Sequence, residues 1–153
     1  IAFRFANIVG PGQTHGIAVD FVEKLRRNPH ELQILGNGTQ TKSYIHSNDA
    51  LDAVFLAHSN SSKKFDVFNV AGNDAISVNQ IAQIAIQEVV GADAQVELKY
   101  TGGDRGWKGD VPTVLLNTDK IKSLGFSPRY SSEEAIQLAI RSMVDAQKSD
   151  ALR

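Results

Sequence analysis

The chain has no cysteine among its 153 residues. This absence excludes disulfide bonds, zinc sites built from thiolates and cysteine nucleophiles, and it is compatible with a reducing compartment. A surplus of one charge sign is also absent, because 16 Lys and Arg stand against 17 Asp and Glu for a formal net charge of −1. A nucleic-acid-binding surface needs clustered cations to neutralise phosphates, so we expect no nucleic-acid partner.

Long hydrophobic runs are absent as well. No stretch approaches the roughly 18 apolar residues of a membrane span, and no basic segment precedes a short apolar one as in a secretory signal. We therefore expect no membrane partner and a cytoplasmic location. The chain begins abruptly, since Ile1 opens the apolar, strand-like run "IAFRFANIVG" with no polar lead-in. We interpret this beginning as a cut edge and expect an upstream part of the protein to be missing.

Predicted strands and helices alternate along the chain, which is typical of the α/β class. The predicted strands, of which the first is expected to be buried, cover residues 2–6, 32–35, 40–46, 65–70 and 96–100. The predicted helices cover residues 16–28, 48–58, 78–90, a short turn from 118 to 125, and 131–147.

Capping residues mark several of these helix starts. Ser77 with Gln80, and Ser131 with Glu134, have the spacing of capping boxes. Ser47 is the expected cap of the helix over residues 48–58 and Thr118 that of the short turn. In the helix over residues 48–58, the side chains expected to face inward are Leu51, Val54, Phe55 and Ala57.

A first candidate binding segment is "ANIVGPGQTHG" at residues 6–16, where a strand end, a Gly/Pro turn and a helix start follow one another. Ligands collect at the carboxyl ends of strands in open α/β sheets, and free amides at a helix start favour a phosphate. On this interpretation Gly16 and Ile17 offer backbone amides to an anion, and Asn7 offers its side-chain amide. An ordinary strand-to-helix loop capped by Asn7 fits the same residues. The glycines do not follow G-x-G-x-x-G, so no dinucleotide fingerprint is predicted.

A second candidate segment is "GNGTQTKSYIHSND" at residues 36–49. A strand with a period of two places Lys42, Tyr44 and His46 on one face, where a cation beside a phenol suits an anionic ligand that carries hydroxyls. The alternative is that Tyr44 and His46 are core residues and Lys42 is a solvated edge charge. No second His or acidic residue lies at metal-ligand spacing from His46, so we expect no metal site.

The third candidate segment, "TGGDRGWKGDVP" at residues 101–112, holds the only Trp of the chain. Arg105 can clamp a phosphate through its planar fork, and Asp110 can accept hydrogen bonds from two neighbouring hydroxyls such as those of a ribose. Trp107 adds a flat apolar surface. A structural loop with Trp107 partly buried is the alternative.

Four segments, in this order, resemble the C-terminal part of the NAD-dependent nucleotide-sugar epimerases and dehydratases, the extended short-chain dehydrogenases. "RFANIVGPG" is similar to the family's R-x-x-N-x-x-G-P, and "LQILGNGTQTKSYIHSNDALDA" to its LGDG-x-Q-x-R-D-Y-I-H-V-x-D. "FNVAGNDAISVNQIA" is similar to its FNvG-x-x-x-x-S-v-x-E-I, and "DRGWKGDVPTVLLNTDKIKSLGFSP" to its R-x-G-D loop followed by D-x-x-K-x-x-x-LGW-x-P. The resemblance covers nearly the whole chain and is greatest for the UDP-glucose 4-epimerases.

This resemblance implies a fold and a ligand. The fold is the C-terminal part of an extended Rossmann-type fold, that is, the last sheet strand plus a small mixed α/β substrate-binding domain over residues 1–153. The ligand is an NDP-sugar, with UDP-sugar as the leading candidate. The residues implied in its binding are Asn7, Gly16, Ile17, Gln33, Leu35, Lys42, Tyr44, Arg105 and Asp110.

Each of these residues has an implied role. Asn7 and the two helix-start amides would approach the diphosphate, residues 33–35 would lie beside the base, and Tyr44 would line the pocket. Lys42 and Arg105 would neutralise the diphosphate, and Asp110 would hold the ribose. The family usually has Arg where this chain has Lys42, so a point charge replaces a bidentate fork and the hold on the phosphate should be weaker.

The same resemblance implies NAD in the parent protein and no cofactor bound by this chain alone. The family's hydride transfer needs an N-terminal Rossmann domain with a glycine-rich NAD loop and a Tyr-x-x-x-Lys pair. None of the three tyrosines here, Tyr44, Tyr100 and Tyr130, has Lys four residues later. We therefore expect the substrate-binding portion of an NAD-dependent epimerase, whose partners are the nucleotide-sugar, the missing Rossmann domain and, as often in this family, a second copy.

Three other interpretations stay open at this point. One is a dehydratase or reductase of the same family, which residues near the catalytic Tyr would distinguish. Another is a non-catalytic module that binds nucleotide-sugars and never had a cofactor domain. The third is a plain α/β scaffold, for which alanine at Arg105 would leave ligand affinity unchanged.

Overall fold

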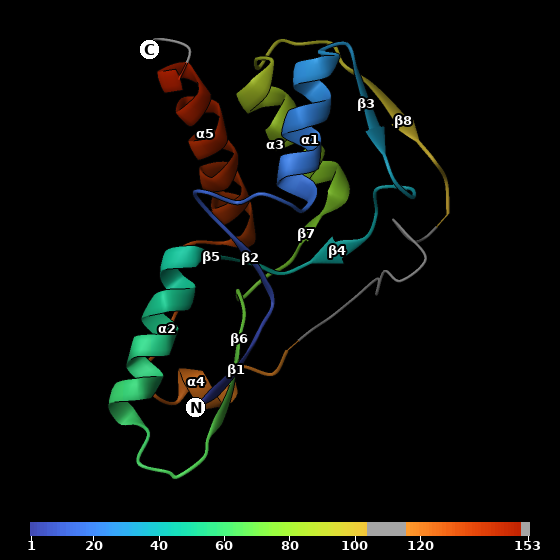
Figure 1. The fold of residues 1–153 in the computed structure, drawn as a ribbon. Coiled ribbons are helices and arrows are strands. Elements are labelled where there is room, and N and C mark those ends of the chain that lie inside the picture. The colour runs from blue at the N-terminus through green and yellow to red at the C-terminus, as the bar shows by residue number, and fades with distance from the viewer. Residues whose placement is uncertain (104–115, 151–153) are drawn as a thin grey trace.

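The structure is a computed structural model that describes residues 1–103 and 116–150, with side chains up to residue 146. Helices and short strands alternate, which confirms the α/β class (Figure 1). The strands are β1 (Ala2–Phe5), β2 (Asn7–Val9), β3 (Glu31–Ile34), β4 (Thr41–Lys42), β5 (Tyr44–His46), β6 (Val67–Val70), β7 (Ile76–Ser77) and β8 (Glu97–Tyr100). The helices are α1 (Ile17–Arg27), α2 (Ser47–Asn60), α3 (Val78–Val89), α4 (Asp119–Lys122) and α5 (Ser132–Asp150). Within the described part of the chain, no helix combines the length and the apolarity needed to cross a lipid bilayer.

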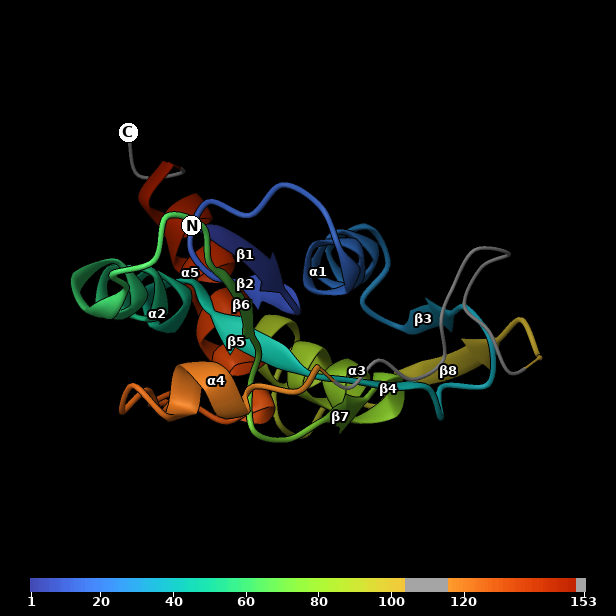
Figure 2. The ribbon, with the colours of Figure 1, turned by 90° about the horizontal axis from the view of Figure 1, so that it is seen from below.

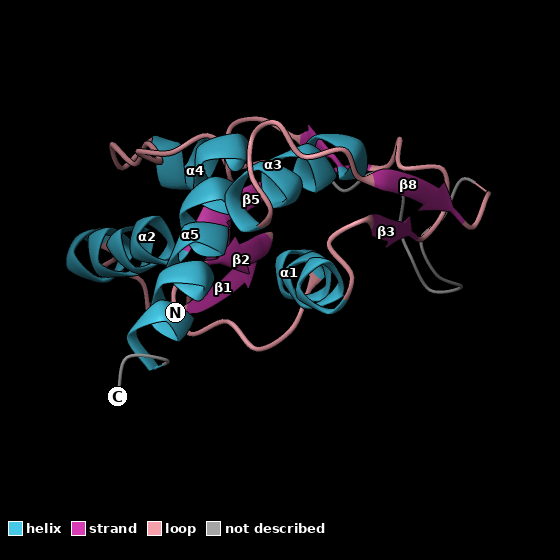
Figure 3. Ribbon diagram, turned by 90° about the horizontal axis from the view of Figure 1, so that it is seen from above, coloured by secondary structure: helices cyan, strands magenta, loops and turns pink. Residues whose placement is uncertain are grey.

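The strands associate as pairs. β1 pairs with β6, β2 with β5 and β3 with β8, all in parallel, whereas β4 and β7 are antiparallel. Parallel neighbours need long crossover connections, and here these contain helices. The β3–β8 pair projects beyond the helices at the end of the molecule opposite α2 (Figures 2 and 3). This arrangement leaves the strand ends of β2, β3 and β4 around the start of α1.

The larger core lies where α1, α3 and α5 stand side by side (Figure 1). Each helix buries residues three and four positions apart, which is the spacing of one helix face. The buried residues of these faces are Ala18, Phe21, Val22 and Leu25 in α1, Ile81, Ala82, Ala85 and Ile86 in α3, and Ala135, Ile136, Ala139 and Ile140 in α5. Many are alanines, so the three helices can approach closely.

A second core packs α2 and α4 against β5 and β6. Its buried residues are Ile45, Ala50, Ala53, Ala57, Phe68, Val70, Ile121 and Phe126. The prediction that Leu51 and Phe55 face inward is wrong, because their exposed fractions are 53% and 64%. Asp49, Ala53 and Ala57 are four residues apart and therefore form one stripe along α2. The hydrogen bonds of Asp49 turn this stripe toward the protein interior. Leu51 and Phe55 lie roughly opposite that stripe.

The prediction that the first strand is buried is also wrong. β1 has β6 as its paired neighbour in the described chain, and most of β1 is exposed. Phe5 is 39% exposed. Phe65, predicted to begin a strand, precedes β6 and is 71% exposed. Apolar strand-like composition therefore did not determine burial at these two places.

The capping boxes occur as predicted. The Ser77 hydroxyl accepts from the Gln80 amide at 3.2 Å, and the Gln80 side chain accepts from the Ser77 amide at 3.0 Å. Ser131 and Glu134 form the same reciprocal pair at 3.2 and 2.8 Å. Thr118 forms no side-chain cap among the described residues. Instead, the Asn117 side chain accepts from the Asp119 amide at 3.0 Å.

The helix cap predicted at Ser47 is supplied by His46. Nδ1 of His46 accepts from the Asn48 amide at 3.2 Å, and the imidazole ring meets the Tyr130 ring edge-on at 5.2 Å between centroids. Burial lowers the pKa of His46 below its ordinary 6.5, and the Arg129 guanidinium adds to this while the Asp49 carboxylate opposes it. The neutral imidazole is therefore the form that the fold favours, and it is also the form that can accept at Nδ1.

Acidification should therefore destabilise the protein through His46. Below the ordinary pKa of 6.5, the unfolded chain binds a proton at this residue more readily than the folded chain, so the free energy of unfolding falls as the pH falls. Urea unfolding at intervals between pH 7.5 and 5.5 measures the slope. His46→Asn keeps a cap acceptor but cannot titrate, and we expect it to flatten the slope. Equal slopes in both proteins would contradict this role of His46.

Candidate functional site

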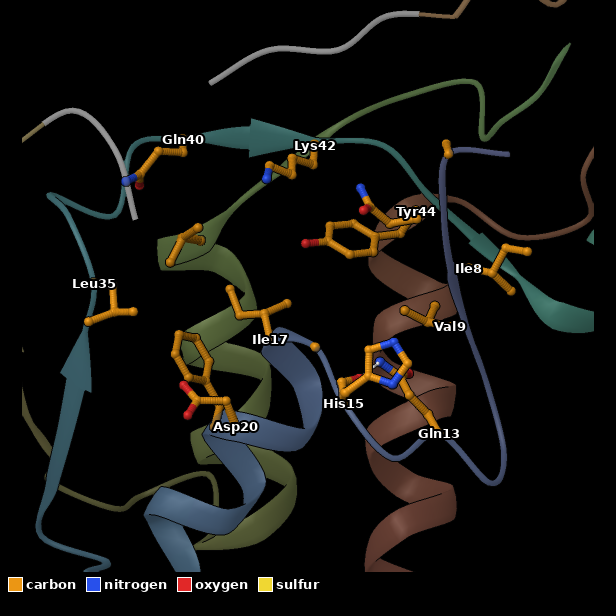
Figure 4. A pocket seen from close by; sticks show the side chains of 15 residues that line it. Ile8, Val9, Gln13, His15, Ile17, Asp20, Leu35, Gln40, Lys42 and Tyr44 are labelled. Carbon is orange, nitrogen blue, oxygen red and sulfur yellow. Dashed lines mark hydrogen bonds between the residues drawn. The ribbon is translucent and has the colours of Figure 1, made fainter. Parts of the chain in front are cut away.

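A pocket of about 800 Å³ opens between β2, the start of α1, the end of β3 and the β4–β5 segment (Figure 4). The residues that line it are Ala6, Asn7, Ile8, Val9, Gln13, His15, Gly16, Ile17, Asp20, Phe21, Leu35, Gln40, Lys42, Tyr44 and Val78. Figure 4 shows Leu35 and Gln40 at one end, Ile8, Val9, Gln13 and His15 at the other, and Lys42, Ile17 and Tyr44 between them. Pockets of this size are typical of small-molecule sites.

Asn7 reaches the pocket from a strand that the sequence did not predict. β2 runs parallel to β5, with Asn7 opposite Tyr44. The Asn7 side-chain nitrogen donates to the Ser43 carbonyl at 3.1 Å. This hydrogen bond orients the Asn7 amide, and the start of α1 at Gly16 has no side-chain cap among the described residues.

The start of α1 forms part of the pocket wall. Gly16 precedes the helix with a φ of 98°, a conformation that residues with a Cβ rarely adopt. Its carbonyl accepts from the Asp20 amide at 3.0 Å, while the earlier amides of the first turn have no partner within the helix. Such amides and the helix dipole favour an anion. Asp20 also lines the pocket, and Lys24 balances its charge through an ion pair of 2.6 Å.

Lys42 and Tyr44 come to the pocket from two strands that the sequence predicts as one. The predicted strand divides at Ser43, because β4 pairs with β7 while β5 pairs with β2. Ser132, the first residue of α5, holds β5 in place. Its hydroxyl accepts from the Tyr44 amide at 3.0 Å and donates to the Tyr44 carbonyl at 3.2 Å. His46 does not line the pocket. The prediction that it shares a ligand-binding face with Lys42 is therefore wrong.

Of residues 33–35, which were expected beside a base, only Leu35 lines the pocket. Leu35 follows the end of β3 and is 44% exposed. Gln33 is exposed outside the pocket, where its carbonyl accepts from the Lys24 ammonium at 3.2 Å.

Arg105, Trp107 and Asp110 lie outside the described residues. The segment just before them is anchored at the Leu35 end of the pocket. The Thr101 amide donates to the Ile34 carbonyl at 3.0 Å, and the Gly36 amide donates to the Thr101 hydroxyl at 2.8 Å.

Several polar residues that line the pocket were not predicted from the sequence, namely Gln13, His15, Asp20 and Gln40. The first three have no pattern that separates them from ordinary loop and helix residues. Gln40 does have one, because the period of two that selects Lys42 and Tyr44 also selects residue 40. In the part of the chain described, no three His, Asp or Glu side chains gather where they could hold a metal ion.

Comparison with known proteins identifies relatives of this chain. Residues 1–71 match the NAD dependent epimerase/dehydratase family. The chain is 27% identical to human dTDP-D-glucose 4,6-dehydratase over 142 residues, which are 90% of this chain and 39% of that protein. The resemblance predicted from the sequence is thereby confirmed.

Solved structures agree with the sequence matches. A crystal structure of UDP-galactose 4-epimerase superposes with a TM-score of 0.80 at 32% identity, covering 95% of this chain and 45% of that one. The protein MoeE5, in complex with UDP-glucuronic acid and NAD, gives 0.77 at 26% identity, covering 95% and 47%. The chain thus has part of a Rossmann-type epimerase/dehydratase fold, and it spans less than half the length of these relatives.

Proposed function

We propose, from the kinship of this chain with the NAD dependent epimerase/dehydratase family, that its pocket binds the nucleoside diphosphate part of a UDP-sugar. The observation that carries the proposal is the convergence of Lys42, Asn7 and the first turn of α1 on one pocket. These groups come from three separate segments and all favour an anion or its oxygen atoms.

The pocket suggests how such a ligand lies. The diphosphate would sit at its middle, between the Lys42 ammonium and the amides of Gly16 and Ile17 (Figure 4). The base would occupy the end near Leu35, and the sugar would extend past Tyr44 toward Ile8. Placed in this way, the charged part of the ligand meets the cation and the flat, less polar base meets apolar side chains.

Residues 104–115 would complete the site, as their sequence indicates. Arg105 would be the second group to neutralise the diphosphate, and Asp110 would accept hydrogen bonds from the ribose hydroxyls. Thr101 supports this proposal, because its hydrogen bonds hold the chain beside the proposed base end three residues before Asp104.

The parent protein would be an NAD-dependent epimerase. NAD would take up a hydride from a sugar hydroxyl carbon and return it, while residues 1–153 bind and orient the nucleotide-sugar. No Tyr-x-x-x-Lys pair occurs in these residues, so the proton and hydride steps are assigned to the rest of the parent. Epimerase is favoured over dehydratase because, among solved structures, UDP-galactose 4-epimerase superposes at 32% identity with a TM-score of 0.80, and a dTDP-glucose 4,6-dehydratase at 18% with 0.75.

Isothermal titration of the complete protein that carries this chain with UDP and UDP-glucose tests the proposal. We expect both to bind, with most of the affinity present in UDP, and we expect UDP to raise the thermal midpoint. ADP, which carries the same diphosphate on a different base, is the control. If UDP and UDP-glucose leave the thermal midpoint unchanged and release no binding heat, the proposed function is wrong.

A further inference from the structure

The side chain of Gln40 forms part of the pocket wall and is buried. Gln40 is 5% exposed, and neither its oxygen nor its nitrogen has a partner in the described part of the chain. Burial of an unpaired amide is unfavourable, and nearly all buried polar groups in proteins are satisfied. A glutamine kept in this state has an acceptor and a donor available for a ligand.

The backbone around Gln40 is fixed. Its carbonyl accepts from the Val78 amide at 3.0 Å, and the Gly38 carbonyl accepts from the Asn79 amide at 3.0 Å. Gly38 has a φ of 77°, which permits the tight turn that brings the segment onto the start of α3. β4 then follows directly and pairs with β7. These backbone hydrogen bonds therefore hold the Gln40 side chain at one position in the pocket wall.

The direction of the side chain selects one part of the pocket. In Figure 4 the Gln40 amide is directed toward the end where Leu35 lies and away from Lys42. Leu35 lies at that end, and Phe21 and Val78 are further apolar residues that line the pocket. A hydrogen-bonding group at that end would bind a flat, mostly uncharged part of the ligand rather than its diphosphate.

We propose that Gln40 recognises the imide edge of a pyrimidine base and so makes the site specific for uridine or thymidine diphosphates. Its carbonyl oxygen would accept from the ring N3–H, and its NH₂ group would donate to a neighbouring ring carbonyl. An amide and an imide are complementary in this way, because each presents one donor beside one acceptor. The inference rests on the proposed function, which places the base near Leu35.

A cycle that combines a protein change with a ligand change tests the pairing. UDP and N3-methyl-UDP, which lacks the imide proton, are titrated into the complete protein and its Gln40→Met variant. Methionine keeps the length of the side chain and removes both hydrogen-bonding atoms. N3-methylation should weaken binding about tenfold or more in the unchanged protein and about twofold or less in the variant. UDP itself should bind the variant about tenfold more weakly.

Stability provides a second readout that a merely structural glutamine would not give. Because Gln40→Met removes an unpaired buried amide, we expect the ligand-free thermal midpoint to rise, by about 2–4 °C. Gln83→Met, at an exposed position of α3, is the matched control and should change neither the midpoint nor the affinity. If the methionine variant fails to fold, Gln40→Glu serves in its place. It keeps the shape and the acceptor for N3–H but replaces the donor to the ring carbonyl with a second acceptor, so it should bind UDP about tenfold more weakly, and unchanged UDP affinity would overturn the pairing.

The outcomes separate the two proposals. If the unchanged protein does not bind UDP, the proposed function fails and this inference fails with it. If UDP binds well but N3-methylation has the same effect with and without the Gln40 amide, only the inference is overturned. A fall in the thermal midpoint of Gln40→Met with unchanged UDP affinity would likewise assign Gln40 to the core.

Discussion

Asp49→Ala is expected to lower the free energy of unfolding by about 2–4 kcal/mol, since two backbone amides lose their acceptor. The Asp49 side chain is 1% exposed and accepts from the amides of Arg129 and Tyr130 at 3.0 and 3.2 Å, and from Nε of Arg129 at 2.8 Å. These bonds attach the segment before α5 to the start of α2. Equilibrium unfolding in urea, monitored by circular dichroism, measures the loss.

Asp52 provides the control for this prediction. It also pairs with Arg129, but its side chain is 59% exposed and its bond is to the guanidinium rather than to a backbone amide. Exposed ion pairs contribute little because water and salt screen them, so Asp52→Ala should leave stability nearly unchanged. If Asp49→Ala and Asp52→Ala had the same small effect, the hydrogen bonds of Asp49 would not be what holds α2 to α5.

Lys42→Ala is expected to weaken UDP binding about ten- to hundredfold, since a charged hydrogen bond to phosphate would be lost. Lys42 lies at the middle of the pocket, between the proposed base and sugar ends. The affinity should also fall with added salt in the unchanged protein, and less so in the variant. Titration calorimetry at two salt concentrations measures both effects.

Lys42→Arg distinguishes charge from geometry. A guanidinium can bind two phosphate oxygens at once, whereas an ammonium acts as a point charge, so we expect the arginine variant to bind UDP as tightly as the unchanged protein or more tightly. Lys63→Ala, in an exposed loop away from the pocket, removes one charge and should leave affinity unchanged. Equal affinities of the alanine variants at positions 42 and 63 would remove Lys42 from the site.

The helices were largely predictable because their signals are local. The capping boxes at Ser77 and Ser131 and the apolar spacing of α1 depend on residues within one or two turns of one another. The buried face of α2 was not predictable in this way. It is determined by Asp49 and by the distant segment at Arg129, which outweigh the larger apolar side chains Leu51 and Phe55.

The candidate site was predictable where family motifs and a strand period coincided. Lys42 and Tyr44 were selected by both, and they line the pocket as the segment pattern suggested. Gln33 was selected by the family resemblance alone, and it lies outside the pocket. The roles of Arg105 and Asp110 stay predictions from sequence.

The sequence by itself determined the α/β class, the resemblance to the epimerases and dehydratases, and the capping boxes at Ser77 and Ser131. These follow from local patterns and from motif order along the chain. The tertiary structure decided which side chains share the pocket, because β2, β4 and β5 take their partners from distant segments and divide a predicted single strand at Ser43. It also showed that the side-chain amide of Gln40 has no partner among the described residues, since burial and hydrogen-bond satisfaction depend on neighbours that only folding brings together.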